Sequence, residues 1–453
     1  MKLFKHQQQT AEFWSSQQRI FDSSDPGTGK TIAAIAGYKM SNVRERMLVI
    51  APLSILKPSW GDDITRFAPE LTYAVAHGDH TKRLKAFEST AEIVVINHDG
   101  VKWLTKNLSL LANFSHLVVD EFTAFKNRTT QRSKALAQVA KSFEYISMLS
   151  GTPNSNKITD IWFPATIIDQ GVRLGTNYFR FQNEVCTPIP LPYTNNATEW
   201  REKEGAREYV ADCLKDITVR HVFEECTDIP EHSEHTMLVE MPPKVMKEYQ
   251  ELKDHAFISF SQGNIDAQHA GILAKKLLQL LSGAIYNEDG EVIDCHPHRY
   301  ELVLDLIQQR EQCVVAFNWR HERIALAKLA DKLKIPYGII DGTVSVKDRE
   351  RVVADFQNGK LKVIFAQPQS AGHGLTLTAG TSTIWCSPTY NAEHFVQFNR
   401  RIYRTGQKKK TETVMIAARN TIEETVYEKL NGKVVRLEEL LQLFAEFSKT
   451  TQK

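Results

Sequence analysis

The heptapeptide DPGTGKT at residues 25–31 decides the fold, because it follows a short apolar run and opens a helical pattern over Thr31–Met40. Glycines in such a loop let backbone N–H groups approach phosphate oxygens at the start of a helix. Lys30 is then expected to reach the β- and γ-phosphates, and the Thr31 hydroxyl to bind Mg²⁺. Ser24 stands where the complete pattern has glycine, so the match rests on the Gly-x-Gly-Lys-Thr core. We predict a nucleoside triphosphate site at this loop.

Two adjacent acids form the natural partner of the phosphate loop. Asp120 and Glu121 end the apolar run Leu117–Val119, about 90 residues after Lys30. In an open parallel sheet, ligands bind at the edge formed by the carboxyl ends of the strands. Asp120 is expected to hold Mg²⁺, directly or through water, and Glu121 to orient and polarise the attacking water. Adjacent carboxylates also occur by chance on surfaces, so this prediction depends on their position after a phosphate loop.

Short β-branched runs alternate with helical patterns in two parts of the chain, which predicts an α/β fold with parallel sheets. The expected strands are 47–51, 93–96, 117–119 and 145–149 in the first part, and 313–317, 337–340, 362–366, 383–386 and 413–417 in the second. Pro- and Asn-rich loops and longer helical patterns lie between the two parts. We therefore expect two parallel-sheet lobes, at 1–170 and 294–453, joined by a helical, loop-rich bridge at 171–293.

Composition limits the classes of protein to consider. The 453 residues carry 56 Lys and Arg against 54 Asp and Glu, a net charge of +2. This balance excludes a histone-like polycation, and a nucleic-acid binder of this charge needs a local basic path. No apolar run is long enough for a transmembrane helix, and the first residues lack the apolar core of a secretory signal. The scattered cysteines fit reduced thiols, and only Cys295–His298 resembles a metal-binding cluster. We expect a cytoplasmic protein.

The motifs, taken in order, resemble superfamily 2 helicases and within them the Swi/Snf-type translocases on double-stranded DNA. The first part is similar to this family at 3–7, 25–31, 49–56 with Trp60, 120–127 and 150–156. The second part is similar to it at 314–319, 337–343, 369–377 and 397–407. Phe122-Thr123 departs from the Ala-His that usually follows the two acids, which puts the coupling role of that histidine in doubt. Val219-Arg220-His221 resembles the Arg-Arg element of the family, with histidine as the second residue.

The resemblance implies two RecA-like lobes, an ATP site with Mg²⁺, and a DNA path. Catalysis would fall to Lys30, Glu121, Gln397, Arg401 and Arg404. Mg²⁺ would be bound by Thr31 and Asp120. The expected nucleotide contacts are Gln7, Pro26, Gly27, Thr28, Gly29, Lys30, Thr31 and Gly374. The expected contacts to the DNA backbone are Ser54, Asn97, Thr152, Asn318, Trp319, Thr343 and Ser370. Most of these DNA candidates are small polar residues that could equally serve as turns or caps, whereas Trp60 is expected in the core.

Helical spacing supports the arginine assignment independently. Gln397, Arg401 and Arg404 are spaced i, i+4 and i+7, so a helix over Glu393–Arg404 would place all three on one face. A guanidinium is always charged, and its fork of donors suits a transferring phosphoryl group. We therefore predict that the second lobe supplies Arg401 and Arg404 as arginine fingers to ATP held on the first lobe.

The leading hypothesis is an ATP-dependent DNA translocase that remodels branched DNA, such as forks and Holliday junctions. The shortened Gly-Leu-Thr form at 374–376 is similar to the annealing-helicase and fork-remodelling branch. Three alternatives stay open: a 3′–5′ strand-separating helicase on tailed duplex, the motor subunit of a restriction system, and a non-catalytic nucleic-acid-binding module. A bare motor of this length suits a phage or bacterial protein. We expect a monomer with no membrane partner, and a replication or recombination protein as its protein partner.

Overall fold

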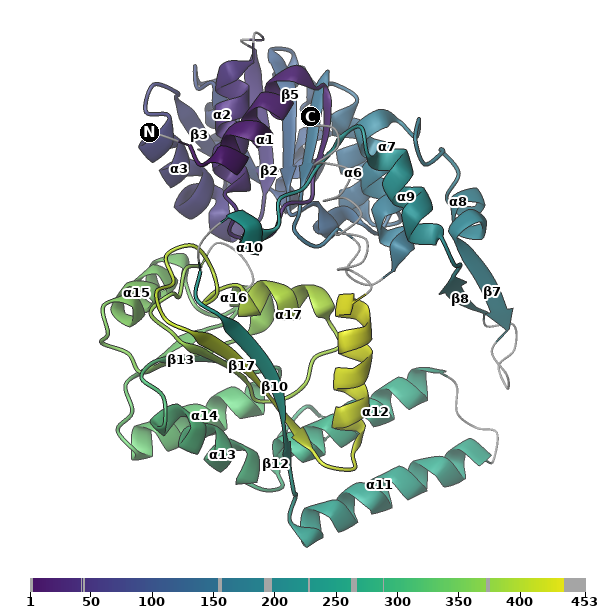
Figure 1. The fold of residues 1–453 in the computed structure, drawn as a ribbon, viewed down its shortest axis with the longest axis vertical. Helices are drawn as coiled ribbons and strands as arrows, with labels where there is room; N and C mark the ends of the chain where they lie inside the picture. The colour runs from purple at the N-terminus through teal and green to yellow at the C-terminus, as the bar shows by residue number, and fades with distance from the viewer. Residues whose placement is uncertain are drawn as a thin grey trace. The chain divides into compact units, whose positions relative to one another are not determined.

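The computed structural model describes residues 3–41, 43, 45–153, 157–190, 198–226, 229–261, 267–287, 289–371 and 375–435 (Figure 1). The chain divides into two units, one of residues 1–228 with 434–453 and the other of residues 229–433. The segment 171–293, expected as a bridge, is therefore shared: residues before 229 pack in the first unit and those from 229 onward in the second. Within the described residues, no helix is long and apolar enough to cross a membrane.

The first unit is built on a parallel sheet. Its strands follow the order β3 (Tyr73–Ala76), β4 (Ile93–Asn97), β2 (Arg46–Ala51), β5 (Phe114–Asp120), β6 (Tyr145–Leu149), β1 (Arg19–Asp22) and β9 (Thr218–Val219). The central strands are buried along their whole length, which explains their nearly continuous apolar sequences. Asp22 and Asp120 both lie opposite Leu149 in the register. The ends of β1, β6 and β5 therefore meet at one edge of the sheet, where the site is expected.

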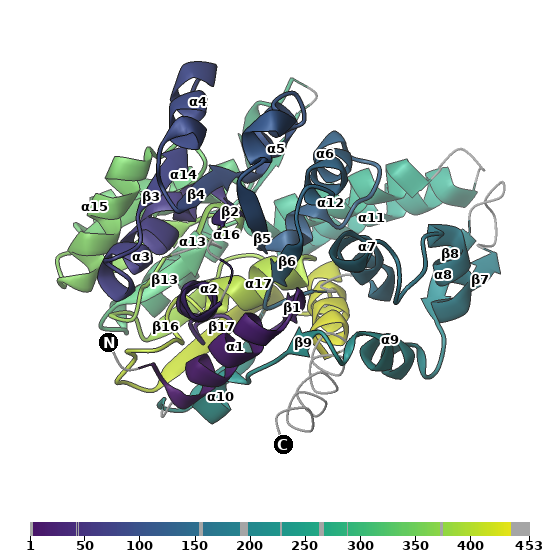
Figure 2. The same cartoon turned by 90° about the horizontal axis from the view of Figure 1, so that it is seen from above.

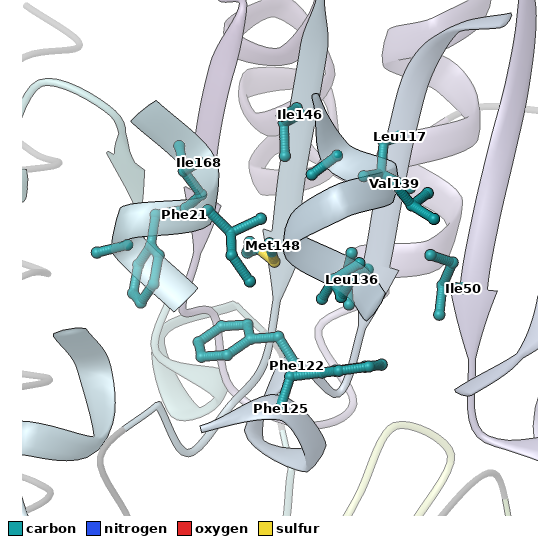
Figure 3. Packing of buried hydrophobic residues seen from close by; sticks show 14 of the residues in the cluster. Phe21, Ile50, Leu117, Phe122, Phe125, Leu136, Val139, Ile146, Met148 and Ile168 are labelled. Atoms are coloured by element: carbon teal, nitrogen blue, oxygen red, sulfur yellow. The ribbon is translucent and has the colours of Figure 1, made fainter. Parts of the chain in front are cut away.

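Helices cover both faces of this sheet. Successive residues of β2 enter different cores, with Leu48 and Ile50 in one cluster and Met47 and Val49 in the other. Figure 3 shows the first cluster, in which Phe122 and Phe125 pack close to Phe21 and Met148. The helices are α1 (Lys5–Ser16), α2 (Lys30–Met40), α3 (Asp62–Phe67), α4 (His80–Glu88), α5 (Val101–Leu104), α6 (Gln131–Ala140), α7 (Trp162–Asp169), α8 (Tyr178–Val185), α9 (Ala206–Leu214) and α10 (Phe223–Cys226).

Helix α1 lies beside α2, as Figure 2 shows from above, and a glycine fixes their close contact. A Cβ atom at Gly37 of α2 would lie 2.3 Å from the Cβ atom of Trp14 in α1. Only glycine allows this approach, and the contact holds α1 beside the helix that begins at the phosphate loop. Because the first turn of α1 carries Gln7, this packing brings the residue to the start of α2.

The second unit has its own parallel sheet. Its strands follow the order β10 (His232–Val239), β17 (Thr411–Ala418), β16 (Ser382–Trp385), β13 (Cys313–Ala316), β15 (Val363–Ala366) and β14 (Tyr337–Ile340). Its helices are α11 (Pro243–Ser261), α12 (Ala267–Ser282), α13 (His298–Gln308), α14 (Arg320–Lys332), α15 (Val346–Gln357), α16 (Pro368–Ala371) and α17 (Ala392–Asn399), and residues 422–435 are also helical. The predicted fold class, two parallel-sheet lobes, is confirmed.

Several elements differ from those predicted. The apolar run of β3 was not recognised, and the polar edge strand β10 is held by its pairing with β17. A hairpin of β7 (Cys186–Pro190) and β8 (Thr198–Glu202) lies where we expected a loop, and the helix that follows begins at Ala206. A further hairpin joins β11 (Ala284–Tyr286) to β12 (Val292–Asp294). The helix expected over Glu393–Arg404 ends at Asn399, which affects the arginine assignment.

All six cysteines are free. Among the described residues, which include Cys295, His296 and His298, no group of three or more His, Cys, Asp or Glu side chains is arranged to hold a metal ion.

Candidate active site

The phosphate loop connects β1 to α2 and requires glycine at position 29. Gly29 has a φ of +88° and directly precedes the helix. A Cβ atom there would lie 2.3 Å from Nε2 of Gln7. Both the backbone conformation and the close approach exclude larger residues. Thr28 folds the loop back on itself, because its hydroxyl donates to the Asp25 carbonyl at 2.8 Å. The backbone N–H groups at the start of α2 are thus available for an anion.

The first turn of α1 is hydrogen-bonded to the phosphate loop. Nε2 of Gln7 donates to the Thr28 carbonyl at 3.2 Å, and Nε2 of His6 donates to the same carbonyl at 2.8 Å. Oε1 of Gln7 accepts from the backbone N–H of Phe4 at 3.1 Å. A shallow surface depression is lined here by His6, Gln7, Asp22, Gly29, Lys30 and His221, among others. Gln7, predicted to read adenine, is therefore placed beside the loop that would hold the phosphates.

Lys30 lies in the first turn of α2 and turns back over the loop. Its ammonium donates to the carbonyls of Ser24 at 2.6 Å and Asp25 at 3.2 Å. Both acceptors are neutral, so the charge of Lys30 is not cancelled by these bonds. Charge-assisted bonds to phosphate oxygens are stronger than bonds to neutral carbonyls. A bound triphosphate can therefore replace the loop carbonyls as the partner of this ammonium group.

The acid pair lies at the end of β5. Oδ2 of Asp120 accepts a hydrogen bond of 2.9 Å from the indole N–H of Trp60, and its carbonyl accepts one of 2.8 Å from His98. Oδ1 of Asp120 accepts from the backbone N–H of Glu121 at 3.0 Å. Burial, and then the charge of Glu121, raises the pKa of Asp120 to about 7, against the opposing effects of Trp60 and Lys30. Trp60 and the backbone N–H of Glu121 thus hold the carboxyl group in place. The nearby charge of Lys30 does not offset the effect of burial on its pKa.

Glu121 has an unusual backbone. Its φ of +51° lies in the left-handed region, which is costly for a residue with a side chain. The hydroxyl of Ser150, at the end of β6, donates to Oε2 of Glu121 at 3.4 Å. This contact links the acid pair to the segment 150–156, which resembles the family in sequence. Such strain is common where a turn must aim a functional side chain.

The chemistry of these residues fits a divalent cation. Asp120 and Glu121 place two adjacent carboxyl groups at the end of β5, and that of Asp120 is buried with a raised pKa. Hard cations such as Mg²⁺ prefer carboxylate and hydroxyl oxygens and are completed by water and phosphate. Asp120 would hold the ion, and Thr31 would supply the hydroxyl from the first turn of α2. When bound, Mg²⁺ would neutralise charge on the transferring phosphoryl group.

A buried ion pair connects the phosphate loop to a residue that lies far from it in the sequence. Arg220 follows β9, is 7% exposed, and donates from Nη2 to Oδ1 of Asp25 at 2.7 Å. A second donor of its guanidinium reaches the Ser23 carbonyl. The other oxygen of Asp25 accepts from the backbone N–H of Phe223 at 2.9 Å. Arg220 and the backbone after it therefore hold the residue that begins the loop.

The residue after Arg220 also contacts the loop, through its backbone. The N–H of His221 donates to Oγ of Ser24 at 3.1 Å, and its carbonyl accepts from the N–H of Asp25 at 3.0 Å. Burial lowers the pKa of the His221 side chain, so this position is neutral where the family has a second arginine. Arg220 is thus the cation that this segment supplies to the buried Asp25.

The prediction that one helix carries Gln397, Arg401 and Arg404 was wrong, because Arg401 and Arg404 lie beyond the end of α17. A continuing helix would use the Arg401 carbonyl internally, but here it accepts from the N–H of Leu377 at 2.9 Å. The two guanidinium groups nevertheless converge, since Nη1 of Arg401 and of Arg404 donate to the Leu375 carbonyl at 3.4 and 2.8 Å. Nε of Arg401 also donates to the Gln397 carbonyl at 2.8 Å. Gly374 lies outside the described residues.

The match to known protein families agrees with this geometry. The SNF2-related domain matches residues 6–288, and the helicase conserved C-terminal domain matches residues 298–406. The chain belongs to the SNF2-related family. It is therefore an ATPase of the helicase class, and the predicted resemblance is confirmed. Within this family assignment, the first domain contains the phosphate loop and the acid pair, and the second contains Gln397, Arg401 and Arg404.

Relatives of this SNF2-related chain include a phage protein of similar size. Protein p41 of Acyrthosiphon pisum secondary endosymbiont phage 1 is 28% identical over 431 residues, covering 90% of this chain and 91% of p41. The DNA annealing helicase and endonuclease ZRANB3 of Bos taurus is 22% identical over 432 residues, covering 92% of this chain but only 38% of that protein. The Sulfolobus solfataricus SWI2/SNF2 ATPase core in complex with dsDNA aligns over 97% of this chain and 93% of that one, at 22% identity and a TM-score of 0.45.

The candidate DNA contacts of this SNF2-related protein differ in accessibility. Ser54 and Trp319 are partly exposed, and the ring of Trp319 lies 5.8 Å from Nζ of Lys275. Asn97 and Thr152 are buried. The others bond within the protein: Asn318 donates to the Ser387 carbonyl at 2.9 Å, Thr343 to Asp341 at 2.6 Å, and Ser370 to Gln367 at 3.5 Å. Their role in binding DNA stays a prediction.

Sequence reasoning missed several residues that position the site. Trp60 was expected only in the core, and His98 and Asp25 were not singled out. In the second unit, the fully buried Glu322 accepts from the N–H groups of Asn318 at 2.7 Å and Trp319 at 3.0 Å. Burial raises the pKa of Glu322 to about 7. Its position three residues after Trp319, at the start of a helix, was the available signal, because that spacing is typical of a capping acid.

Replacing Trp60 with phenylalanine tests whether its N–H positions Asp120. An aromatic side chain is kept, although phenyl is smaller than indole, and one buried oxygen of Asp120 loses its donor. Partners of metal-binding side chains typically contribute about 10- to 100-fold to metal affinity or activity. We expect at least a 10-fold rise in the Mg²⁺ concentration needed for half-maximal ATP hydrolysis. Trp103→Phe, which removes an indole N–H bonded to His80, is the control, and equal Mg²⁺ curves for both variants would contradict the role.

Replacing Arg404 with alanine tests the finger assignment. An arginine finger typically accelerates hydrolysis by about 10³-fold or more. We expect Arg404→Ala to bind ATP within a few-fold of wild type and to lose turnover by about that factor. Arg400→Ala is the matched control, because Arg400 stacks on Tyr403 at 5.0 Å instead of joining the pair at Leu375. Single-turnover hydrolysis measures the effect, and wild-type rates for Arg404→Ala would refute the assignment.

Proposed function

We propose that the protein is an ATP-driven translocase that tracks on the backbone of duplex DNA and remodels branched DNA. One observation carries this proposal: a single chain of the SNF2-related family keeps every charged group that ATP hydrolysis needs. Lys30, Asp120 and Glu121 gather at one sheet edge of the first unit, and Arg401 and Arg404 converge in the second. A non-catalytic binding module has no need of this set.

In the proposed cycle, ATP is a ligand of both units. Lys30 and the N–H groups of the phosphate loop bind its phosphates from the first unit, while Arg401 and Arg404 approach the γ-phosphate from the second. Glu121 would orient the attacking water, and Asp120 and Thr31 would hold Mg²⁺, which would neutralise charge on the phosphates. Loss of the γ-phosphate would remove contacts that ATP can make and ADP cannot, so the two nucleotides would favour different conformations of the protein. Repetition of this change would move the protein along DNA.

Contacts to the DNA backbone would support tracking without sequence preference. The net charge of +2 means that binding depends on local basic surface instead of the overall charge. Backbone contacts release counterions, so affinity should fall steeply with salt and vary little with sequence. A monomer would suffice for this activity, because the residues proposed for both halves of the ATP site belong to one chain. Its work on DNA would take place in the cytoplasm of a bacterial or phage-infected cell.

The preference for branched DNA rests on two narrower observations. The Gly-Leu-Thr segment at 374–376 is similar to the annealing-helicase branch, and one relative that aligns over most of this chain is named a DNA annealing helicase. We therefore propose forks, Holliday junctions and branch migration as the substrates and reaction. A replication or recombination protein would be the fitting protein partner.

A panel of DNA substrates tests this proposal through ATP hydrolysis. The panel contains no DNA, single strand, linear duplex, fork and four-way junction, each at two salt concentrations. We expect the strongest stimulation by forks and junctions, and a loss of stimulation at high salt. The Lys30→Ala variant controls for contaminating ATPases, since it loses the ammonium that would contact phosphate.

The panel separates the parts of the proposal. Equal stimulation by linear duplex and by forks would remove the branch preference and leave a general translocase. No stimulation by any DNA, with ATP binding intact, would contradict DNA as the substrate.

A further inference from the structure

The segment that follows the acid pair is strongly basic. Residues 122–141 contain five basic residues and no acidic residue, in a chain whose overall charge is only +2. Lys126 pairs with Asp160 at 3.7 Å and Arg132 with Asp99 at 3.6 Å, both longer than close ion pairs. No carboxylate of the described residues pairs with the remaining three, which are Arg128, Lys134 and Lys141. This segment therefore has a local excess of positive charge, which a nucleic-acid binder with balanced overall charge requires.

One of the unpaired cations lies against exposed aromatic rings. The guanidinium of Arg128 is 4.5 Å from the ring centre of Tyr178 and 5.1 Å from that of Phe179, at the start of α8. Phe179 is 62% exposed, although large apolar side chains are usually covered in a folded protein. The attraction between the Arg128 guanidinium and these rings does not explain why Phe179 is exposed, because such contacts also form in buried sites. The arrangement therefore offers an apolar ring and a positive charge together at the surface.

The base of this cluster is rigid. Tyr178 meets the buried Trp162 edge-on, with ring centres 5.4 Å apart, and packs against the main core of the first unit. The indole N–H of Trp162 is held by the carbonyls of Leu174 and Gly175 at 3.2 and 3.1 Å. Asn177 caps α8 through a bond of 3.1 Å from the N–H of Arg180. The exposed ring thus projects from a fixed support, and little entropy is lost when a planar ligand stacks on it.

We propose that Arg128, Tyr178 and Phe179 form a stacking platform for an unpaired nucleic-acid base. Aromatic side chains with arginine beside a basic path are the features by which proteins bind single strands without sequence preference. The bases of an intact duplex are stacked on each other, so a surface ring cannot reach their faces. The platform would therefore bind single-stranded segments next to a branch, while residues 126–141 contact their phosphates. The biological meaning of this site rests on the proposed function, but base binding can be measured without it.

Binding of a fluorescent dT20 strand and of a 20-mer of abasic sites tests the platform. Both oligonucleotides have the same phosphates, but only dT20 has bases to stack. We expect wild-type protein without nucleotide to bind dT20 about 10-fold more tightly than the abasic strand. Phe179→Ala should remove this difference and leave the abasic affinity unchanged, whereas Arg128→Ala should weaken binding to both strands. Phe179→Tyr, which keeps a ring, should restore the preference.

Val172→Ala is the matched surface control, because Val172 is an apolar side chain of the same unit that is 81% exposed. Phe179→Ala that keeps the full preference for dT20 would overturn the proposal, as would a wild-type protein that binds both strands equally. These results differ from a failure of the proposed function, in which ATP hydrolysis would not respond to any DNA while the preference for dT20 persists.

Discussion

Replacement of Glu121 with glutamine should leave ATP bound and slow its hydrolysis by at least about 100-fold. The change keeps the shape of the side chain, and Ser150 can still donate to its carbonyl oxygen. An amide cannot polarise water as a carboxylate does, so the chemical step loses the group that orients and activates the nucleophile. Removal of one charge of the acid pair should not weaken the binding of an anionic nucleotide. Equilibrium binding of a fluorescent ATP analogue and single-turnover phosphate release measure the two effects separately.

Glu88→Gln is the matched control for this substitution. Glu88 is exposed at the end of α4, and its replacement makes the same chemical change away from the loop and the acid pair. Its binding and single-turnover rate should equal those of wild type. If Glu121→Gln also hydrolyses ATP at the wild-type rate, the water-activating group lies elsewhere. If it fails to bind ATP, the residue supports the fold of the site and not the chemistry.

Replacement of Arg220 with methionine should both destabilise the first unit and weaken ATP binding. The side chains of Arg220 and Asp25 are 6% and 10% exposed, and they pair at 2.7 Å. Removal of one partner of a buried pair leaves the other charge without compensation, at a cost of about 3–5 kcal/mol. Because Asp25 begins the phosphate loop, its displacement should disturb the N–H groups that face the phosphates. Denaturant unfolding and ATP titration of the same preparation would detect both losses.

The double variant Arg220→Met with Asp25→Asn separates the ion pair from general packing. With both charges removed, no buried carboxylate is left unpaired, so part of the lost stability should return. The N–H of Phe223 can still donate to the asparagine oxygen. A double variant that is as unstable as the sum of the two single variants would contradict a pairwise role for Arg220 and Asp25.

Local sequence was sufficient to predict the frame of the molecule. The strand that carries Asp120 contains the apolar run Leu117–Val119, which is buried because strands of a covered parallel sheet face protein on both sides. The loop sequence itself dictates a turn with positive φ at Gly29, and the acid pair follows its strand directly. These features depend on residues that are neighbours in the chain, which explains why a single sequence predicts them.

The missed features depend on residues that are far apart in sequence. Trp60 meets Asp120 across 60 residues, and Arg220 meets Asp25 across 195. The end of α17 is set by the N–H of Leu377, which takes the Arg401 carbonyl out of the helical pattern. Helical spacing predicted that the side chains of Arg401 and Arg404 converge, and they do. They converge outside the helix, however, and not on one of its faces. Periodicity reports local preference, and tertiary hydrogen bonds override it.

Displacement of a third strand from a DNA triplex is the most direct test of ATP-driven movement on duplex DNA. A fluorescent oligonucleotide bound in the major groove of a linear duplex is removed by a motor that moves along the duplex, without separation of the two duplex strands. The account predicts rapid displacement by the wild-type protein with ATP and Mg²⁺, and none by Glu121→Gln or without ATP. A wild-type protein that hydrolyses ATP on this DNA but never displaces the third strand would contradict translocation.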